Sequence, residues 1–302
     1  MKIIDTNNLP RPIVEAIRAG VWDREQAVKH TSYSVTQLLD APRRVHLRDR
    51  HYNEMEVEAS DRLWALFGNA MHYVLETGVP DDIGKVVLKE HRLSADVLGR
   101  AISGQCDLYV DGVLYDFKET STWTLIYHSR DLDWTHQLNF YAWLLRQHDY
   151  PVREAHIIAR LRDWSKSKAA RESKYPKSQV KAMQIPLYDA GQVDRMVHDR
   201  VQALIDCEKL PDDKLPECSP DDRWMRNTTY AVMHPKKKRA LAVKDTEKLA
   251  TDWLINYADK GCWVEKRPGK NVRCEEYCQL KPWCSQWHKL KRQPDVEKIV
   301  CK

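Results

Sequence analysis

Apolar residues recur every three or four positions in several parts of the chain, which is the spacing of one face of an α-helix. In the helix predicted after residue 60, this stripe comprises Trp64, Phe67, Met71 and Leu75. A later stripe comprises Trp134, Leu138, Tyr141 and Leu145. The helices that this spacing predicts cover residues 1–30, 34–39, 61–77, 132–148 and 189–209. A strand is predicted near 156–162, followed by a polar loop at 165–178.

Residues 86–118 show the patterns typical of strands. Asp111-Gly112 separates two apolar runs there, and this dipeptide favours a two-residue hairpin turn because both residues tolerate positive φ. With such a turn, counting outward places Asp107 directly opposite Asp116. The other face of the hairpin, which can form core, comprises Leu108, Val110, Val113, Tyr115 and Phe117.

The opposed carboxylates of Asp107 and Asp116 need an explanation, because residues directly opposite in a hairpin have Cβ atoms about 5 Å apart and like charges there repel. A divalent cation between the two carboxylates would provide one. Lys118 projects from the same face, since it lies two residues beyond Asp116. The hairpin thus presents two carboxylates and an ammonium group together.

Composition narrows the class of protein. The 302 residues suffice for a full core with a smaller lobe, and no run approaches the roughly 18 apolar residues of a membrane span. Without a signal-peptide pattern, we expect a cytoplasmic protein, in which eight Cys favour metal or cluster ligation over disulfides. The net charge of +5 permits a nucleic-acid partner without requiring one. Eleven Trp, scattered along the chain, favour core and rim packing over a base-stacking platform.

Two motifs flank the hairpin. Gly68-x-x-x-His72-x-x-x-Glu76 lies on the helix before it, and Gln137-x-x-x-Tyr141 lies on the helix after it. Residues four apart share one face of a helix, so each motif directs its side chains to one side. The order is therefore a helix with His and Glu, a strand with Asp, a strand with Asp-x-Lys, and a helix with Gln and Tyr.

This order resembles the RecB-like branch of the PD-(D/E)XK nucleases, whose hallmarks are GxxxHxxxE-like, GxxD, (D/E)xK and QxxxY motifs. All four occur in order across residues 68–141. The resemblance implies an α/β fold, with a restriction-endonuclease-like αβββαβ core, a helical N-terminal extension and a C-terminal cysteine-containing lobe. The helical lead-in, the nuclease core and the lobe would cover residues 1–60, 61–210 and 211–302.

The residue types suit a hard metal ion. Mg²⁺ and Mn²⁺ prefer oxygen ligands, which Asp107, Asp116 and the Phe117 carbonyl could supply. Mn²⁺ would also accept the imidazole of His72. Such an ion lowers the pKa of bound water and stabilises negative charge on a phosphate that is being cleaved.

The remaining residues of the motifs would assist. Lys118 would orient or help deprotonate the attacking water and share the developing charge. The resemblance implies that Glu76 lies near the metal, and that Gln137 and Tyr141 position the catalytic lysine or the DNA backbone. The expected catalytic residues are Asp107, Asp116, Lys118, Glu76, Gln137 and Tyr141.

Cys274, Cys278 and Cys284 form a closely spaced trio near the C-terminus. Three thiols need a fourth ligand to complete a tetrahedral zinc site or a cubane cluster. The trio resembles the C-terminal clip of iron–sulfur nucleases, namely the AddB nuclease domain, CRISPR-adaptation nucleases and related phage exonucleases. In several of these an upstream Cys-Pro supplies the fourth ligand, whereas this chain has Ala41-Pro42 at the equivalent stretch.

Two other cysteines are candidates for the fourth ligand. Cys218 lies in a loop bracketed by Pro216 and Pro220, whereas Cys262 begins a predicted strand. Phage-type relatives carry a Pro-x-Cys loop followed by acidic residues and Arg-Trp, which favours Cys218. We expect a [4Fe–4S] cluster on Cys218 and the trio, with a structural Zn²⁺ or four unrelated thiols as alternatives. Either cofactor would pin the lobe to the core; redox activity does not follow.

Pro235-Lys236-Lys237-Lys238-Arg239 has the composition of a nuclear localisation signal. Short predicted strands at 230–233 and 240–243 flank it, so a solvated hairpin tip fits better. In a nuclease, the same tip could contact phosphate.

The predicted function is a metal-dependent DNA exonuclease that hydrolyses phosphodiester bonds in recombination, repair or phage DNA metabolism, within a bacterial cell or a phage-infected host. The alternatives are a CRISPR-adaptation-type DNA-processing nuclease within a complex and a non-catalytic DNA-binding or scaffold subunit. The intact Asp107, Asp116 and Lys118 argue against the last. The expected partners are DNA and a helicase, recombinase or CRISPR-type protein, since no GxxxxGK[ST] loop is present for unwinding.

Overall fold

The computed structural model describes residues 1–27, 32–257, 261–291 and 297–299, so residues 28–30 of the predicted lead-in lie outside the described residues. Contacts between residues divide the chain into two compact units. The first comprises residues 1–40 and 53–208, and the second comprises residues 41–52 and 209–302. In the described part of the chain, none of the helices is both long enough and apolar enough to span a membrane.

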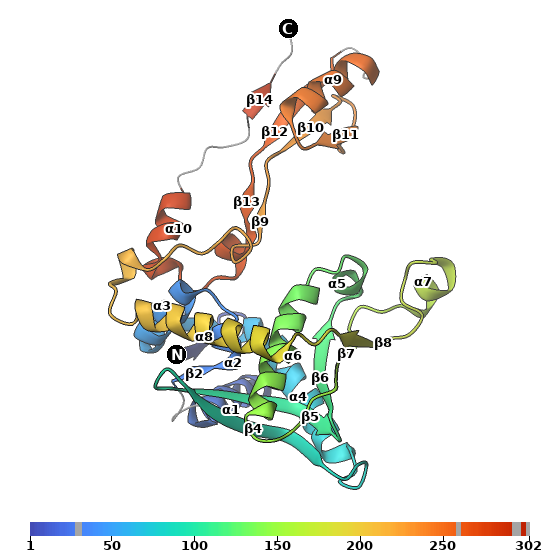
Figure 1. Cartoon of the computed structure of the whole chain (residues 1–302). Coiled ribbons are helices and arrows are strands. Elements are labelled where there is room, and N and C mark those ends of the chain that lie inside the picture. The colour runs from blue at the N-terminus through green and yellow to red at the C-terminus, as the bar shows by residue number, and fades with distance from the viewer. Residues whose placement is uncertain (28–31, 258–260, 292–296, 300–302) are drawn as a thin grey trace. The chain divides into compact units, whose positions relative to one another are not determined.

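A six-stranded mixed sheet forms the centre of the first unit (Figure 1). Its strands are β2 (Tyr33–Ser34), β4 (Val87–Val97), β5 (Arg100–Val110), β6 (Val113–Thr120), β7 (Glu154–Leu161) and β8 (Val180–Ile185). β5 is antiparallel to β4 and β6 and parallel to β2. β6 is parallel to β7, which is antiparallel to β8.

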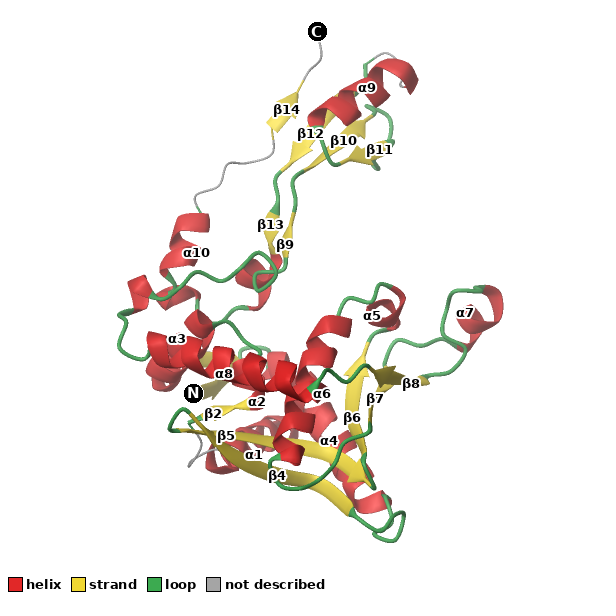
Figure 2. Ribbon diagram, viewed as in Figure 1, coloured by secondary structure: helices red, strands yellow, loops and turns green. Residues whose placement is uncertain are grey.

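The first unit also contains seven helices in its described residues (Figure 2). They are α1 (Arg11–Ala27), α2 (Val35–Leu38), α4 (Leu63–Gly78), α5 (Thr122–Ile126), α6 (Asp131–Arg146), α7 (Lys166–Arg171) and α8 (Ala190–Cys207), with 3-10 turns at Tyr52–Glu54 and Ala59–Arg62. The order α4, β4, β5, β6, α6, β7 is the αβββαβ order that the motifs implied. The expected mixed α/β class is therefore confirmed.

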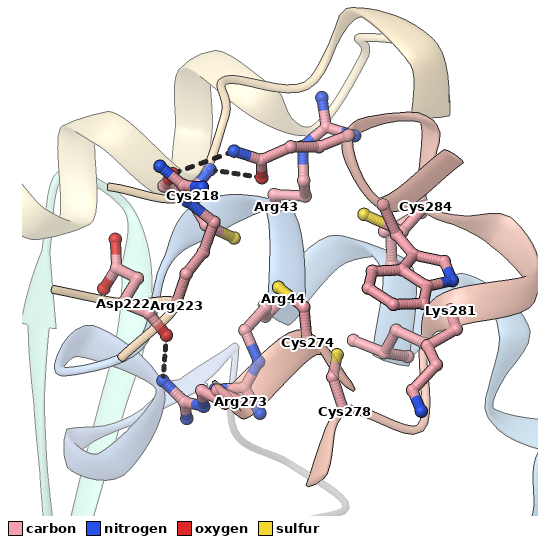
Figure 3. A pocket seen from close by; sticks show the side chains of 14 residues that line it. Arg43, Arg44, Cys218, Asp222, Arg223, Arg273, Cys274, Cys278, Lys281 and Cys284 are labelled. Atoms are coloured by element: carbon pink, nitrogen blue, oxygen red, sulfur yellow. Dashed lines mark hydrogen bonds between the residues drawn. The ribbon is translucent and has the colours of Figure 1, made fainter. Parts of the chain in front are cut away.

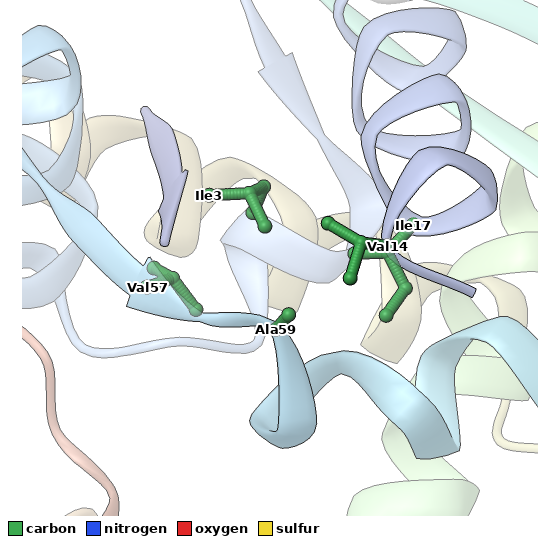
Figure 4. Close-up of a cluster of buried hydrophobic side chains, with 5 residues drawn as sticks. All are labelled: Ile3, Val14, Ile17, Val57 and Ala59. Atoms are coloured by element: carbon green, nitrogen blue, oxygen red, sulfur yellow. The ribbon is translucent and has the colours of Figure 1, made fainter. Parts of the chain in front are cut away.

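The N-terminal stretch is not wholly helical. Residues Lys2–Ile4 form strand β1, which pairs in parallel with β3 (Glu56–Glu58). Their apolar side chains close a small cluster with α1 and the turn before α4 (Figure 4): Ile3, Val14, Ile17, Val57 and Ala59. The first residues form a strand because two β-branched side chains in succession suit a paired, half-buried edge.

The β5–β6 hairpin has the predicted turn. Asp111 and Gly112 have φ values of 46° and 96°, and Val110 pairs with Val113. Helices α4 and α6 each contact both strands of the hairpin. Leu114, on the face of Asp116, is fully buried, so core lies on the carboxylate face. On the face that was predicted to form core, only Leu108 is buried, and the other four residues are half-buried: Val110, Val113, Tyr115 and Phe117.

The two apolar helix stripes have different outcomes. All four residues of the α6 stripe are buried, as expected, because α6 contacts both the sheet and α8. In α4, by contrast, Trp64 is 57% exposed and Phe67 is 50% exposed. Leu63 and Leu66 pack against the N-terminal cluster instead.

The second unit contains two small sheets and a helical region. β9 (Met225–Arg226) pairs with β13 (Lys270–Asn271), and a four-stranded antiparallel sheet has the order β11 (Ala242–Lys244), β10 (Thr229–Met233), β12 (Trp263–Arg267), β14 (Glu297–Ile299). The helices are α3 (Pro42–His51), α9 (Glu247–Tyr257) and α10 (Ser285–Leu290), with a π-helical turn at Arg273–Tyr277 and 3-10 turns at Asp212–Lys214 and Lys281–Trp283. The exposed basic tract 235–239 joins β10 to β11, the hairpin expected from its flanks.

Candidate metal centre and cysteine pocket

The carboxylate of Asp107 lies at the centre of a set of contacts between α4, β4 and the hairpin. His72 Nδ1 lies 2.8 Å from Glu90 Oε1 and 3.5 Å from Asp107 Oδ1. The other Asp107 oxygen accepts the backbone N–H of Phe117 at 2.7 Å. His72, Glu90 and Asp107 each offer a ligand atom, and these atoms all lie within 4.8 Å of one another. This trio has the donor types that Mn²⁺ accepts.

Asp116 and Lys118 form the adjoining part of the site. Lys118 Nζ lies 2.5 Å from Asp116 Oδ2, and Gln137 Nε2 donates to Asp116 Oδ1 at 3.4 Å. Asp116 is 2% exposed, whereas a quarter of the Lys118 side chain reaches solvent. The buried carboxylate is thereby held from both sides, while part of the Lys118 side chain stays accessible.

Gly104 explains how α6 reaches this site. A Cβ atom at this position would lie 2.8 Å from Tyr141 Cε1 and 2.9 Å from Val35 Cγ2. Only glycine allows the helix to approach β5 so closely. Tyr141 is buried here, and burial followed by the charges of the two aspartates raises the pKa of its hydroxyl, so it remains a neutral hydrogen-bonding group.

Electrostatics favour a cation at Asp107. Burial, followed by the charge of Asp116, raises the pKa of Asp107 to about 7, although His72 and Lys118 act in the opposite direction. The hydrogen bond to Glu90 raises the pKa of His72. Asp107 resists ionisation beside a histidine whose pKa is raised, and a divalent ion would replace the protons that these two groups hold.

Glu90 is the residue that the sequence analysis missed. It has a φ of 43° within a strand, a conformation that costs about 1–3 kcal/mol for a non-glycine residue and is concentrated at functional sites. Its neighbours pair with Leu108 and Cys106, which leaves Glu90 opposite Asp107. Counting outward from the Leu98-Gly99 turn between β4 and β5 would have found it.

Glu76 and Gly68, the two other residues of the α4 motif, make no hydrogen bond or ion pair with Asp107 or Asp116 among the described residues. Glu76 lies one helical turn after His72 with its side chain exposed, outside the His72–Glu90–Asp107 trio. No atom lies within 4 Å of a Cβ built on Gly68, so its side of α4 is open.

Four cysteines line one pocket of the second unit (Figure 3): Cys218, Cys274, Cys278 and Cys284. Their side chains point into the same space from three chain segments. Cys262, the alternative fourth candidate, does not line this pocket. The structure therefore brings together in one pocket the four cysteines that the sequence analysis favoured.

Buried polar side chains hold these segments in place. Gln286 accepts the backbone N–H of Cys218 and donates to its carbonyl, both at 2.9 Å. Arg43, 1% exposed, donates to the carbonyls of Leu215 and Pro216 and to the hydroxyl of Ser285. Helix α3 is thus tied to the loop before Cys218 and to the helix that follows Cys284.

Burial in this pocket keeps the free thiols neutral, although arginine side chains lie nearby. Burial raises the pKa of Cys218 to about 12 and that of Cys274 to about 11, and neighbouring cysteines add to both effects. Arg44 lowers both values, and Arg223 lowers that of Cys274. These guanidinium groups would offset the charge of four thiolates bound to a metal.

No family model matches the sequence, and no curated protein matches it. Among solved structures, the crystal structure of SSO0001 is similar with a TM-score of 0.42 and 17% identity, over 62% of this chain and 84% of that one. A phage-related exonuclease from Haemophilus somnus 129PT is similar with a TM-score of 0.32 and 15% identity, over 47% of this chain and 68% of that one. Each similarity covers only part of this chain, at low sequence identity.

Proposed function

We propose that this protein is a metal-dependent deoxyribonuclease of the PD-(D/E)XK type and, because its cysteine trio resembles that of iron–sulfur phage exonucleases, an exonuclease. The observation that carries the proposal is the pair of buried carboxylates Asp107 and Asp116, which contact a His–Glu pair on one side and Lys118 on the other. Buried like charges are unfavourable unless a cation or proton compensates them.

The residues divide the work. Asp107, Asp116, His72 and Glu90, with the Phe117 carbonyl, would hold a divalent ion, which when bound supplies an activated water and Lewis acidity. Lys118 would orient the attacking water and donate to the phosphate oxygen that gains charge, since its ammonium group lies against Asp116 and a quarter of its side chain reaches solvent. Gln137 keeps the Asp116 carboxylate in position through its amide.

The test of this proposal compares two carboxylates of one strand. Asp116→Asn should abolish Mn²⁺-dependent degradation of end-labelled DNA, a loss of at least about 100-fold, because the carboxylate that faces the metal and Lys118 is gone. Glu119→Gln is the matched control, since Glu119 pairs with Arg160 at 2.8 Å and touches no residue of the site in the described contacts. Equal degradation by wild type and Asp116→Asn would refute the proposal.

For the second unit we propose a [4Fe–4S] cluster bound by Cys218, Cys274, Cys278 and Cys284. The four thiols and the surrounding guanidinium groups fit an anionic cluster.

Anaerobic purification with iron and sulfide analysis tests the cluster. Cys218→Ser should lose iron, and Cys262→Ser should retain it, because Cys218 lines the pocket and Cys262 does not. Stoichiometric zinc in place of iron would establish the alternative cofactor, and retained iron in Cys218→Ser would remove Cys218 from the ligand set.

A further inference from the structure

Large aromatic side chains are exposed on two helices of the first unit. Trp64 and Phe67 of α4 are at least half exposed, and their ring centroids lie 6.2 Å apart. On α5, Trp123 is 48% exposed and Tyr127 is 71% exposed, and their rings stack at 5.8 Å with an interplanar angle of 15°. Soluble proteins rarely expose such rings together without a partner.

The exposed rings of α4 lead to the metal centre. Trp64, Gly68 and His72 are spaced four residues apart, so they share one face of α4. The middle position is open, because nothing lies within 4 Å of a Cβ built on Gly68. This face therefore runs from an exposed indole, over bare backbone, to the imidazole beside Asp107.

The same region is joined to the ends of β6 and β7. The guanidinium group of Arg162 lies 4.5 Å from the ring centroid of Trp64, and the Arg162 backbone N–H donates to the carbonyl of Thr120, the last residue of β6. Helix α5 begins directly after Thr120, at Thr122. Trp64 therefore lies at the strand end from which α5 starts, and Lys118 is two residues before that end.

A basic segment begins at the same place. Residues 162–179 carry six Lys or Arg and only two acidic residues, and this segment forms the excursion with α7 between β7 and β8 (Figure 1). Cations beside exposed rings match a polyanion whose bases are available for stacking. A duplex hides its base faces, whereas a single strand exposes them.

We propose that the exposed rings of α4 and α5, namely Trp64, Phe67, Trp123 and Tyr127, form a stacking platform for single-stranded DNA that enters the metal centre. The proposal rests on the proposed nuclease function and adds its substrate class. Bases stack on the rings, Arg162 and the basic segment follow the phosphates, and the open side of Gly68 lets the backbone approach His72.

Fluorescence anisotropy with a labelled oligo(dT) strand and a duplex of equal length tests the platform, in the Asp116→Asn background so that the strand stays intact. Trp64→Ala and Trp123→Ala should each weaken oligo(dT) binding roughly tenfold, because one base–aromatic stack is lost. Trp64→Phe should retain most of the affinity. The slope of log affinity against log salt should not change, because no phosphate contact is removed.

Tyr257→Ala is the matched control, since this tyrosine of the second unit is 74% exposed. Unchanged oligo(dT) affinity in both Trp variants, or an equal loss for duplex and single strand, would overturn the platform. Its failure is separable from that of the nuclease proposal. If the wild type cleaves DNA with metal but the Trp variants bind oligo(dT) normally, the nuclease proposal stands and the platform is refuted. If the Trp variants bind oligo(dT) more weakly but the wild type does not cleave DNA, the platform stands and the nuclease proposal is refuted.

Discussion

The carboxylate site of the first unit and the cysteine pocket of the second are built in different ways. The carboxylates lie on neighbouring strands of one sheet and are fixed by a hairpin with its own buried core. The cysteines come from distant segments that meet through Arg43 and Gln286. The first site should therefore exist before its ion binds, whereas the second should depend on its cofactor for structure.

The largest expected effect is loss of the cysteine-bound cofactor. Cys278→Ser should make the second unit susceptible to proteolysis and leave the sheet of the first unit protected, because binding free energy at such a site is folding free energy. In protein that retains the cluster, removing Mg²⁺ or Mn²⁺ with a chelator should not change the protection of either unit against hydrogen exchange. Hydrogen exchange followed by mass spectrometry measures both. Uniform protection in Cys278→Ser would contradict the difference between the sites.

A smaller loss is expected at Arg43. Arg43→Met should reduce the free energy of unfolding of the second unit by about 3 kcal/mol, because buried carbonyls lose a charged donor. Lys289→Met is the control, since the 72%-exposed Lys289 side chain pairs with Glu217 at the surface and should contribute less than about 0.5 kcal/mol. Denaturant titration of the two variants compares them, and equal effects would remove Arg43 from its structural role.

Two glycines test the packing of the first site. Gly104→Ala should destabilise the first unit by about 1–3 kcal/mol, since its Cβ would overlap Tyr141 and Val35. Gly68→Ala should stabilise it by up to about 1 kcal/mol, because alanine favours the helix and the space is open. Thermal unfolding of both variants gives the sign, and a destabilised Gly68→Ala would show that α4 is packed more closely.

The sequence predicted elements best where local chemistry decides them. Asp111-Gly112 determines the hairpin because its turn needs positive φ at both positions, and these were found. The pairing that starts at the Leu98-Gly99 turn puts Glu90 opposite Asp107, but no local pattern predicts its positive φ, which accompanies tertiary contacts with His72 and Gln105. Trp64 was assigned to an apolar stripe, yet the spacing of a stripe does not reveal which side of a helix has a partner. Cys218 could be favoured over Cys262 only by resemblance, since no local pattern brings residue 218 to residue 284.

In the absence of metal, the stability of the first unit should also depend on pH. Asp107 and His72 both have raised pKa values, so the folded state holds protons that the unfolded state releases. Their contribution to stability is present at low pH and is lost as pH rises through about 7 at Asp107. Mn²⁺ should therefore raise the melting temperature more at pH 8 than at pH 6. A pH-independent increase would show that neither group binds the ion.

Calorimetric titration with Mn²⁺ tests the metal centre most directly. Wild type should bind the ion, Asp107→Asn and Glu90→Gln should each weaken binding at least tenfold, and Glu76→Gln should bind as wild type does, because Glu76 lies outside the trio. Equal Mn²⁺ affinity in wild type and Asp107→Asn would contradict the account.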